Sequence, residues 1–139
     1  IIFINEVTNK FVTAMDAGYD LIITNYANPD MVGHTGDLSA AITACEAVDK
    51  GLSRVIKALK KSGGAMILIA DHGNCEVMID PHTGGPHTAH TTNVVPIIAI
   101  GVAPNSTISN GRLADVAPTL LQLMNLPSPP EMTGKSLLA

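Results

Sequence analysis

The stretch "DLSAAITACEAVDKGLSRVIKALKKSGGAMILIA", residues 37–70, decides the fold class. Its first part repeats apolar residues at helical spacing, which predicts one long helix with a buried stripe. The stripe comprises Leu38, Ile42, Cys45, Val48, Leu52, Val55, Ile56 and Leu59. Asp37 can cap this helix, and Gly63 with Gly64 can end it. The apolar run at 65–70 is typical of a strand buried on both faces, so a helix here leads directly into a sheet.

The flanking segments repeat this alternation of helices and strands. The expected elements are a helix over residues 5–18 closed by Gly18, a strand at 21–23, a loop at 28–36, a strand at 94–101 and a helix over 113–124. In the last helix, Asp115 is the expected cap and Pro118 falls within the first turn. The alternation predicts an α/β fold with a mostly parallel sheet flanked by helices.

Composition narrows the classes of partner and compartment. The 139 residues suit one domain, and with 3% aromatic residues and no Trp the core must be aliphatic. The net charge is −4 and there is no basic patch, so nucleic acid is not an expected partner. No apolar run approaches the roughly 18 residues of a membrane span. Two Cys, Cys45 and Cys75, fit a reducing cytoplasm.

All five histidines lie in two stretches, "NPDMVGHTGD" at 28–37 and "ADHGNCEVMIDPHTGGPHTAHTTN" at 70–93. Each stretch follows a predicted strand, and sites in open α/β sheets form at the carboxyl ends of strands. A single loop histidine is more often a solvated surface residue, so the prediction rests on several residues acting together.

Five of these residues form a mixed set of oxygen and nitrogen donors. They are Asp30, His34, Asp71, His72 and His90. Such a set suits Mn²⁺ or Zn²⁺ better than Ca²⁺. Five ligands exceed what one tetrahedral ion takes, so two neighbouring ions are predicted. His82 and His87 lie in a Gly- and Pro-rich loop, where solvated histidines are ordinary.

Four motifs resemble a known family. "NYANPDMVGHTGD" at 25–37, "ADHGN" at 70–74, "HTAHTTN" at 87–93 and "EMTGKSL" at 131–137 resemble the C-terminal part of cofactor-independent (2,3-bisphosphoglycerate-independent) phosphoglycerate mutase. That family belongs to the alkaline phosphatase superfamily. The resemblance covers nearly the whole chain. It implies that residues 1–139 are the C-terminal segment of a metal-binding phosphatase-like domain, without its N-terminal segment and inserted transferase domain.

The resemblance implies an isomerase of glycolysis that interconverts 3-phosphoglycerate and 2-phosphoglycerate. The family uses two Mn²⁺ ions and a serine that carries the phosphoryl group transiently. By motif, Asp30, His34 and His90 would hold one ion, and Asp71 with His72 would hold the other. His82 and His87 match no family ligand.

The chain also departs from the family pattern. The nucleophilic Ser, expected upstream, and the substrate-binding Arg residues are missing, so no catalytic residue is assigned here and the isolated chain is expected to be inactive. Only Arg54 and Arg112 are present. The expected partner of the parent enzyme is a small phosphoglycerate, and the chain can self-associate through a truncated sheet edge. Two alternatives remain: a non-catalytic metal-binding or interaction domain, and a related metallophosphatase or phosphopentomutase, against which "NPDMVGHTG" argues.

Overall fold

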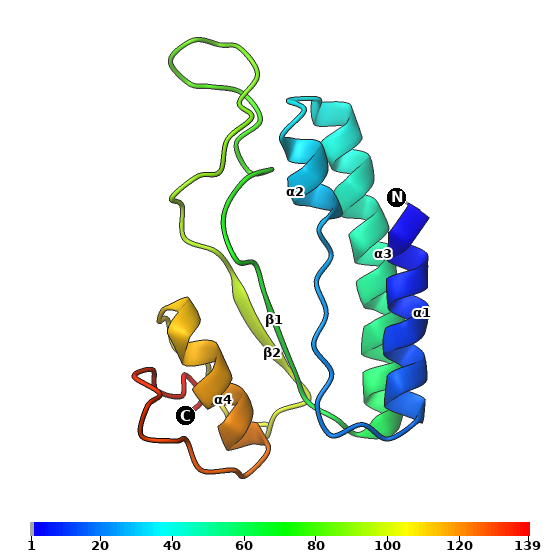
Figure 1. Ribbon diagram of the computed structural model, residues 1–139, viewed down its shortest axis with the longest axis vertical. Helices are drawn as coiled ribbons and strands as arrows, with labels where there is room; N and C mark the ends of the chain where they lie inside the picture. Colours follow the sequence, from blue (N-terminus) through cyan, green and yellow to red (C-terminus); the bar gives the residue numbers. More distant parts are fainter. Residues whose placement is uncertain (1) are drawn as a thin grey trace. The chain divides into compact units, whose positions relative to one another are not determined.

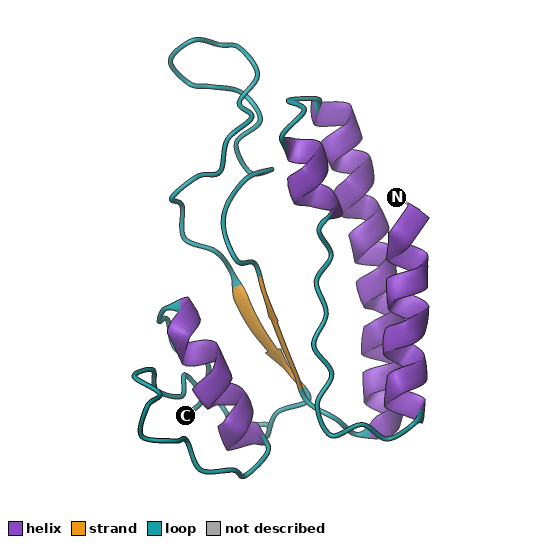
Figure 2. Cartoon of the chain, viewed as in Figure 1, coloured by secondary structure: helices purple, strands orange, loops and turns teal. Residues whose placement is uncertain are grey.

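The computed structural model describes residues 2–139, which form two compact units. The first unit comprises the chain up to Ser62 together with His72–Val94, and the second comprises Gly63–Asp71 and Val95–Ala139. The first unit contains the helices α1 (Ile2–Asp16), α2 (Asn28–Gly33) and α3 (Leu38–Ser62). The second contains the strands β1 (Met66–Ile69) and β2 (Ile97–Ile100), the 3₁₀ turn η1 (Leu113–Asp115) and the helix α4 (Val116–Leu123) (Figures 1 and 2). The predicted α/β class is confirmed. None of the helices in residues 2–139 combines the length and apolarity needed to cross a membrane.

Helix α1 packs along α3 (Figure 1). Thr8 of α1 is fully buried; its hydroxyl donates to the carbonyl of Ile4 at 2.7 Å and lies 2.8 Å from the Tyr26 hydroxyl. Gly51 of α3 faces this group, and a Cβ atom there would lie 2.9 Å from the Thr8 hydroxyl. The glycine therefore allows the two helices to approach closely.

The predicted ends of α3 are confirmed, and the predicted stripe is buried in the second half of the helix but not in the first. Oδ1 of Asp37 accepts the Ala40 N–H at 2.9 Å, and Gly63 takes a positive φ of 72° just after the last turn. The buried residues are Ala41, Ala44, Gly51, Val55 and Leu59, whereas Leu38, Ile42 and Cys45 are exposed. Val55 and Leu59 are thus buried as predicted, whereas in the first half of α3 the small side chains of Ala41 and Ala44 are buried instead. In that half of the helix, the spacing of the apolar residues predicted burial of the larger side chains.

The expected loop at residues 28–36 is instead largely the short helix α2. Pro29 lies in its first turn, where a proline costs no hydrogen bond, and the Met31 N–H donates to the Ala27 carbonyl at 3.0 Å. His34 caps the other end, with its N–H 3.2 Å from the Asp30 carbonyl oxygen. This correction matters for the site, because residues four apart lie on the same side of a helix.

The strand expected at residues 21–23 does not form. The segment is not assigned to any strand, and Leu21 and Ile23 are 45% and 78% exposed. A strand requires a hydrogen-bonded neighbour, and within residues 2–139 the two named strands pair only with each other. An apolar run indicates that a segment favours extended backbone, but it does not show whether a neighbouring strand is present to pair with it.

β1 and β2 pair antiparallel, with Met66 opposite Ile100 and Ile69 opposite Ile97, so the expected parallel orientation is wrong for this pair. Parallel neighbours need a crossover, usually a helix. The connection between β1 and β2 contains no helix (Figure 2), and it returns the chain in the opposite direction. β2 is also shorter than predicted, because it begins only after Pro96, which has no N–H to donate.

Asp115 caps α4 by position but not through its side chain. The carboxylate is 4% exposed; Oδ2 accepts the Arg112 N–H at 2.9 Å and Oδ1 accepts the Lys135 N–H at 3.0 Å. These two main-chain hydrogen bonds hold the pKa of Asp115 below its ordinary value. The residue therefore links the start of the helix to the C-terminal tail. Pro118 lies in the first turn of α4, as predicted.

Candidate metal centre

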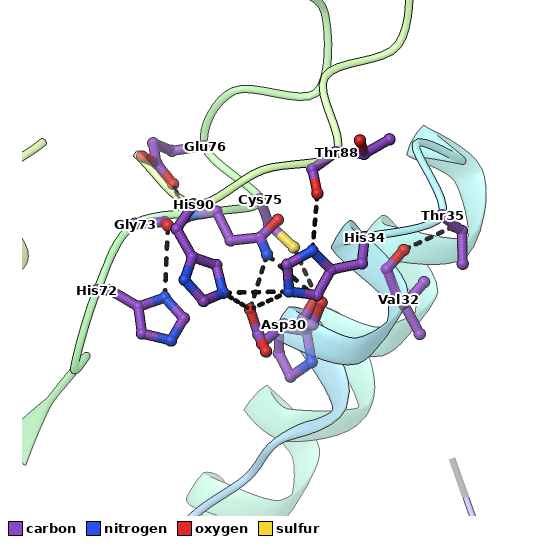
Figure 3. A network of polar contacts seen from close by, with 12 residues as sticks. Asp30, Val32, His34, Thr35, His72, Gly73, Cys75, Glu76, Thr88 and His90 are labelled. Carbon is purple, nitrogen blue, oxygen red and sulfur yellow. Dashed lines mark hydrogen bonds and ion pairs between the residues drawn. The ribbon is translucent and has the colours of Figure 1, made fainter. Parts of the chain in front are cut away.

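Asp30, His34 and His90 converge on one point of the first unit (Figure 3). Nε2 of His90 lies 2.9 Å from Oδ1 of Asp30, and Nε2 of His34 lies 3.3 Å from the same oxygen. The two Nε2 atoms are 3.1 Å apart. Asp30 lies in α2 and His34 caps the end of that helix, whereas His90 comes from the loop before Thr91, 60 residues away from Asp30.

A main-chain carbonyl fixes the tautomer of His34. Nδ1 of His34 lies 2.7 Å from the carbonyl oxygen of Thr88, and because a carbonyl can only accept, Nδ1 carries a proton. In the neutral ring, Nε2 of His34 then presents a lone pair toward the Asp30 carboxylate and His90. A carbonyl or carboxylate that binds the second ring nitrogen is the usual support of a metal-bound histidine.

This donor set fits a divalent cation. Asp30 Oδ1, His34 Nε2 and His90 Nε2 face one another, and each of these atoms can offer a lone pair to a cation. Atoms about 2.0–2.2 Å from one ion lie roughly 3.0–3.5 Å from each other, close to the spacing found here. The three side chains are 35–47% exposed, so an ion and a further ligand can reach them from solvent.

The Asp30 carboxylate is held by Asn74, which sequence reasoning missed. Nδ2 of Asn74 donates to Oδ1 of Asp30 at 2.7 Å. Partial burial raises the pKa of Asp30, but the hydrogen bonds from Asn74 and His90 and the nearby charges of His34 and His90 outweigh it, so the net shift is downward. Gly33 makes room for this amide, because a Cβ atom there would overlap Asn74 Oδ1.

The other two predicted ligands, Asp71 and His72, are not part of this converging group. The ring of His72 stacks on that of His90, with centroids 3.7 Å apart, and its Nδ1 lies 3.4 Å from the Gly73 carbonyl oxygen. Asp71 is exposed and belongs to the second unit. Within residues 2–139, the group of three or more candidate ligands includes neither of them, so their joint metal site stays a prediction.

His82 and His87 are outside the group as well, and both lie in the hairpin between residues 79 and 87. The main-chain N–H of His82 donates to Asp80 Oδ1 at 2.8 Å, and that of His87 donates to the Met78 carbonyl at 3.0 Å. Hydrogen bonds from the main-chain N–H groups of Thr83 and His82 lower the pKa of the Asp80 carboxylate.

Glu76 is a further residue that sequence reasoning did not single out. Its carboxylate accepts the Asn74 N–H at 2.6 Å, the Thr91 hydroxyl and the Asn93 side-chain amide at 3.1 Å. The hydrogen bond from Thr91 is the main cause of its lowered pKa. Its position within the histidine-rich stretch could have marked it as a site residue. The sequence could not show that its hydrogen-bond partners lie 15 and 17 residues away.

The fold and this donor set define a metal-binding α/β protein. The chain belongs to the metalloenzyme superfamily, which residues 4–128 match.

Among its relatives are the 2,3-bisphosphoglycerate-independent phosphoglycerate mutases of Ruegeria pomeroyi and Agrobacterium fabrum, each 71% identical over 133 residues. The match covers 96% of this chain and 26% of each relative, so the chain spans about a quarter of their length. A crystal structure of Leishmania mexicana phosphoglycerate mutase at low cobalt concentration is similar with a TM-score of 0.89 and 32% identity, over 99% of this chain and 28% of that one. The resemblance seen in the motifs is thereby confirmed.

Proposed function

We propose that the chain is the C-terminal, metal-ligating segment of an enzyme that interconverts 3-phosphoglycerate and 2-phosphoglycerate in glycolysis. The observation that carries the proposal is the convergence of Asp30 Oδ1, His34 Nε2 and His90 Nε2, with the His34 lone pair fixed by Thr88. Relatives named for this activity share 71% of the aligned residues, which supports the choice of reaction.

Asp30, His34 and His90 would hold one Mn²⁺ ion, and Asp71 with His72 would contribute to a second. Bound ions would neutralise the charge that spreads over the oxygens of a phosphoryl group in transfer. The chain's own residues keep the donor atoms in place: Asn74 orients the Asp30 carboxylate, and Thr88 fixes the His34 ring.

The remaining groups of the reaction would come from the longer protein. A phosphoglycerate carries a phosphate and a carboxylate, which Arg side chains recognise best. Of the two arginines here, Arg54 donates to the Asn9 side chain at 2.5 Å, and Arg112 donates to the Thr133 carbonyl at 3.2 Å. Both arginines have structural partners, which supports a substrate clamp elsewhere in the longer protein. Two free thiols suit action in the cytoplasm.

A segment exchange tests this proposal. The 133 residues that match in the Ruegeria pomeroyi enzyme are replaced by this chain, and mutase activity is followed with Mn²⁺ in an enolase-coupled assay. We expect the hybrid to be active, and the same hybrid with His90→Ala to lose activity by several orders of magnitude because the ligands act as a unit.

A folded but inactive hybrid would overturn the proposal. If that hybrid still bound Mn²⁺, a non-catalytic metal-binding domain would replace the mutase segment. If it were active on other phosphate esters alone, a related metallophosphatase would replace it.

A further inference from the structure

Three separate segments surround the metal centre: α2 with His34 at its end, the loop from His72 to Glu76, and the residues around His90. The last two have no helix and no named strand. An isolated bridge pairs Gly73 with Thr91, and the Thr91 N–H donates to the Gly73 carbonyl at 2.9 Å. One backbone contact is a weak support for a site whose donor atoms must be held within a few tenths of an ångström.

Glu76 lies at the junction of these segments (Figure 3). Its Oε2 accepts the Asn74 N–H at 2.6 Å, which closes the loop after His72. Its Oε1 accepts the Thr91 hydroxyl and the Asn93 amide at 3.1 Å, both from the segment after His90. A single carboxylate therefore joins two stretches that the sequence separates by 15 residues or more.

Both carboxylate oxygens of Glu76 are thus occupied by donors of the protein itself. Within residues 2–139, the converging candidate ligands are Asp30, His34 and His90, without Glu76. The negatively charged carboxylate of Glu76 accepts hydrogen bonds from N–H and O–H groups of the chain itself. Charge-assisted hydrogen bonds of this kind are about twice as strong as neutral ones.

The hydrogen bonds continue from Glu76 to the metal centre on both sides. On one side, the main-chain N–H of Asn74 donates to the Glu76 carboxylate, and the side-chain amide of Asn74 donates to Asp30 Oδ1 at 2.7 Å. On the other side, Thr91 is the direct neighbour of His90. Gly73 lets the parts meet, because a Cβ atom there would overlap the Thr91 hydroxyl and the Glu76 carboxylate.

We propose that Glu76 is the positioning residue of the metal centre: its carboxylate locks the loop that carries Asn74 to the segment that carries His90, and so presets the Asp30–His90 separation. The inference rests on the proposed metal-binding function. It assigns Glu76 no contact with substrate or metal.

Titration with Co²⁺ tests the proposal on the 139-residue chain, with the visible absorption of the bound ion as a report of ligand geometry. Glu76→Gln keeps the shape of the side chain but places an NH₂ group where one acceptor stood. We expect the affinity for Co²⁺ to fall about 10–100-fold, the range for outer partners of metal ligands, and the spectrum to change. Glu46→Gln, at an exposed position of α3, is the matched control and should bind as the wild type does.

A second pair of variants guards against a Glu76→Gln chain that fails to fold. Thr91→Ser keeps the hydroxyl and should retain the wild-type affinity and spectrum, whereas Thr91→Val removes it and should weaken binding. In the absence of metal, amide exchange at Thr91 should be faster in Glu76→Gln than in the wild type, because the bond to Gly73 opens more often.

The outcomes separate this inference from the function on which it rests. A wild-type chain that binds no Co²⁺ overturns the metal-binding proposal and this inference with it. A wild type that binds Co²⁺, with equal affinity and an unchanged spectrum in Glu76→Gln or in Thr91→Val, overturns only the role of Glu76. Unchanged exchange at Thr91 in Glu76→Gln overturns it as well.

Discussion

Nε2 of His90 lies 2.9 Å from Oδ1 of Asp30, although 60 positions separate the two residues in the sequence. The contact joins helix α2 to the end of the histidine-rich loop. The same oxygen accepts the Asn74 side-chain amide at 2.7 Å, so the carboxylate is fixed from two directions. Two loops that appear independent in the sequence thereby become one site.

Removal of the His34 ring should weaken Mn²⁺ binding strongly. His34→Ala deletes the lone pair that Thr88 orients, leaving two of three ligands, and we expect at least about a tenfold loss of affinity. Isothermal titration calorimetry measures it. His82→Ala, in the exposed hairpin, is the control and should bind normally. Equal affinities in His34→Ala and the wild type would remove His34 from the site.

His90→Ala should weaken Mn²⁺ binding much more than His87→Ala does. The two residues share the short stretch "HTAHT", but only His90 Nε2 faces Asp30, while the main chain of His87 binds Met78 in the hairpin. The comparison uses the same calorimetric titration. A larger effect of His87→Ala would mean that the motif has been placed three residues out of register.

The sequence predicted the three converging donor residues better than it predicted the residues that hold them in place. The residue types and motifs pointed to Asp30, His34 and His90, which do lie together, although the strand expected before Asp30 does not form. Asn74 and Glu76 could not be predicted, because an amide or a carboxylate gains its role only from the partners that the fold brings to it. Those partners lie 44 and 15 residues away.

The fold shows the same division. Local signals placed the ends of α3 at Asp37 and Gly63 correctly, since capping depends on neighbours in the sequence. Features set by distant partners were missed: the antiparallel pairing of β1 with β2, the unpaired run at 21–23 and the burial of Ala41 and Ala44 in the first half of α3. The class followed from the pattern, whereas orientation and burial followed from tertiary contacts.

Gly33→Ala should disturb the metal centre even though alanine favours helices. A Cβ atom at this position would overlap Asn74 Oδ1, so the amide must move away from Asp30. Overpacking of this kind costs about 1–3 kcal/mol, more than the roughly 1 kcal/mol that replacing glycine gains in a helix. We expect lower stability to urea and weaker Mn²⁺ binding.

Gly85→Ala is the control for Gly33→Ala, because the nearest atom to its Cβ, the Thr83 hydroxyl, would be 3.6 Å away. Its urea midpoint and Mn²⁺ affinity should match those of the wild type. If Gly33→Ala matched them too, Asn74 would not depend on the space that Gly33 leaves.

The isolated 139-residue chain should not interconvert the phosphoglycerates. Transfer needs a hydroxyl beside the metal centre, and the nearest candidate by sequence, Thr35, donates its hydroxyl to the Val32 carbonyl at 2.6 Å and accepts the Asp37 N–H at 3.2 Å. The serines are Ser39, Ser53, Ser62, Ser106, Ser109, Ser128 and Ser136. An enolase-coupled assay with Mn²⁺ measures turnover. Robust turnover by the chain alone, unchanged in Thr35→Val, would demand a nucleophile among these serines.

Asp115→Asn should destabilise the second unit at neutral pH without affecting metal binding. Each carboxylate oxygen accepts one main-chain N–H, from Arg112 and from Lys135, and the asparagine NH₂ group would face one of these donors. Thermal unfolding should show a lower Tm than that of the wild type. Asp49→Asn, at an exposed position of α3, removes the same charge and should leave the Tm almost unchanged.

The pH dependence gives this prediction its sign. Hydrogen bonds from Arg112 and Lys135 lower the pKa of Asp115 in the folded state, so the carboxylate stabilises the fold above its unfolded pKa of about 3.9. That contribution is lost as the pH falls through the lower folded pKa. The Tm difference between wild type and Asp115→Asn should therefore be constant near pH 7 and shrink below about pH 4. A difference that stayed constant down to pH 2 would mean that the ionised carboxylate contributes nothing, and that the asparagine acts by its shape alone.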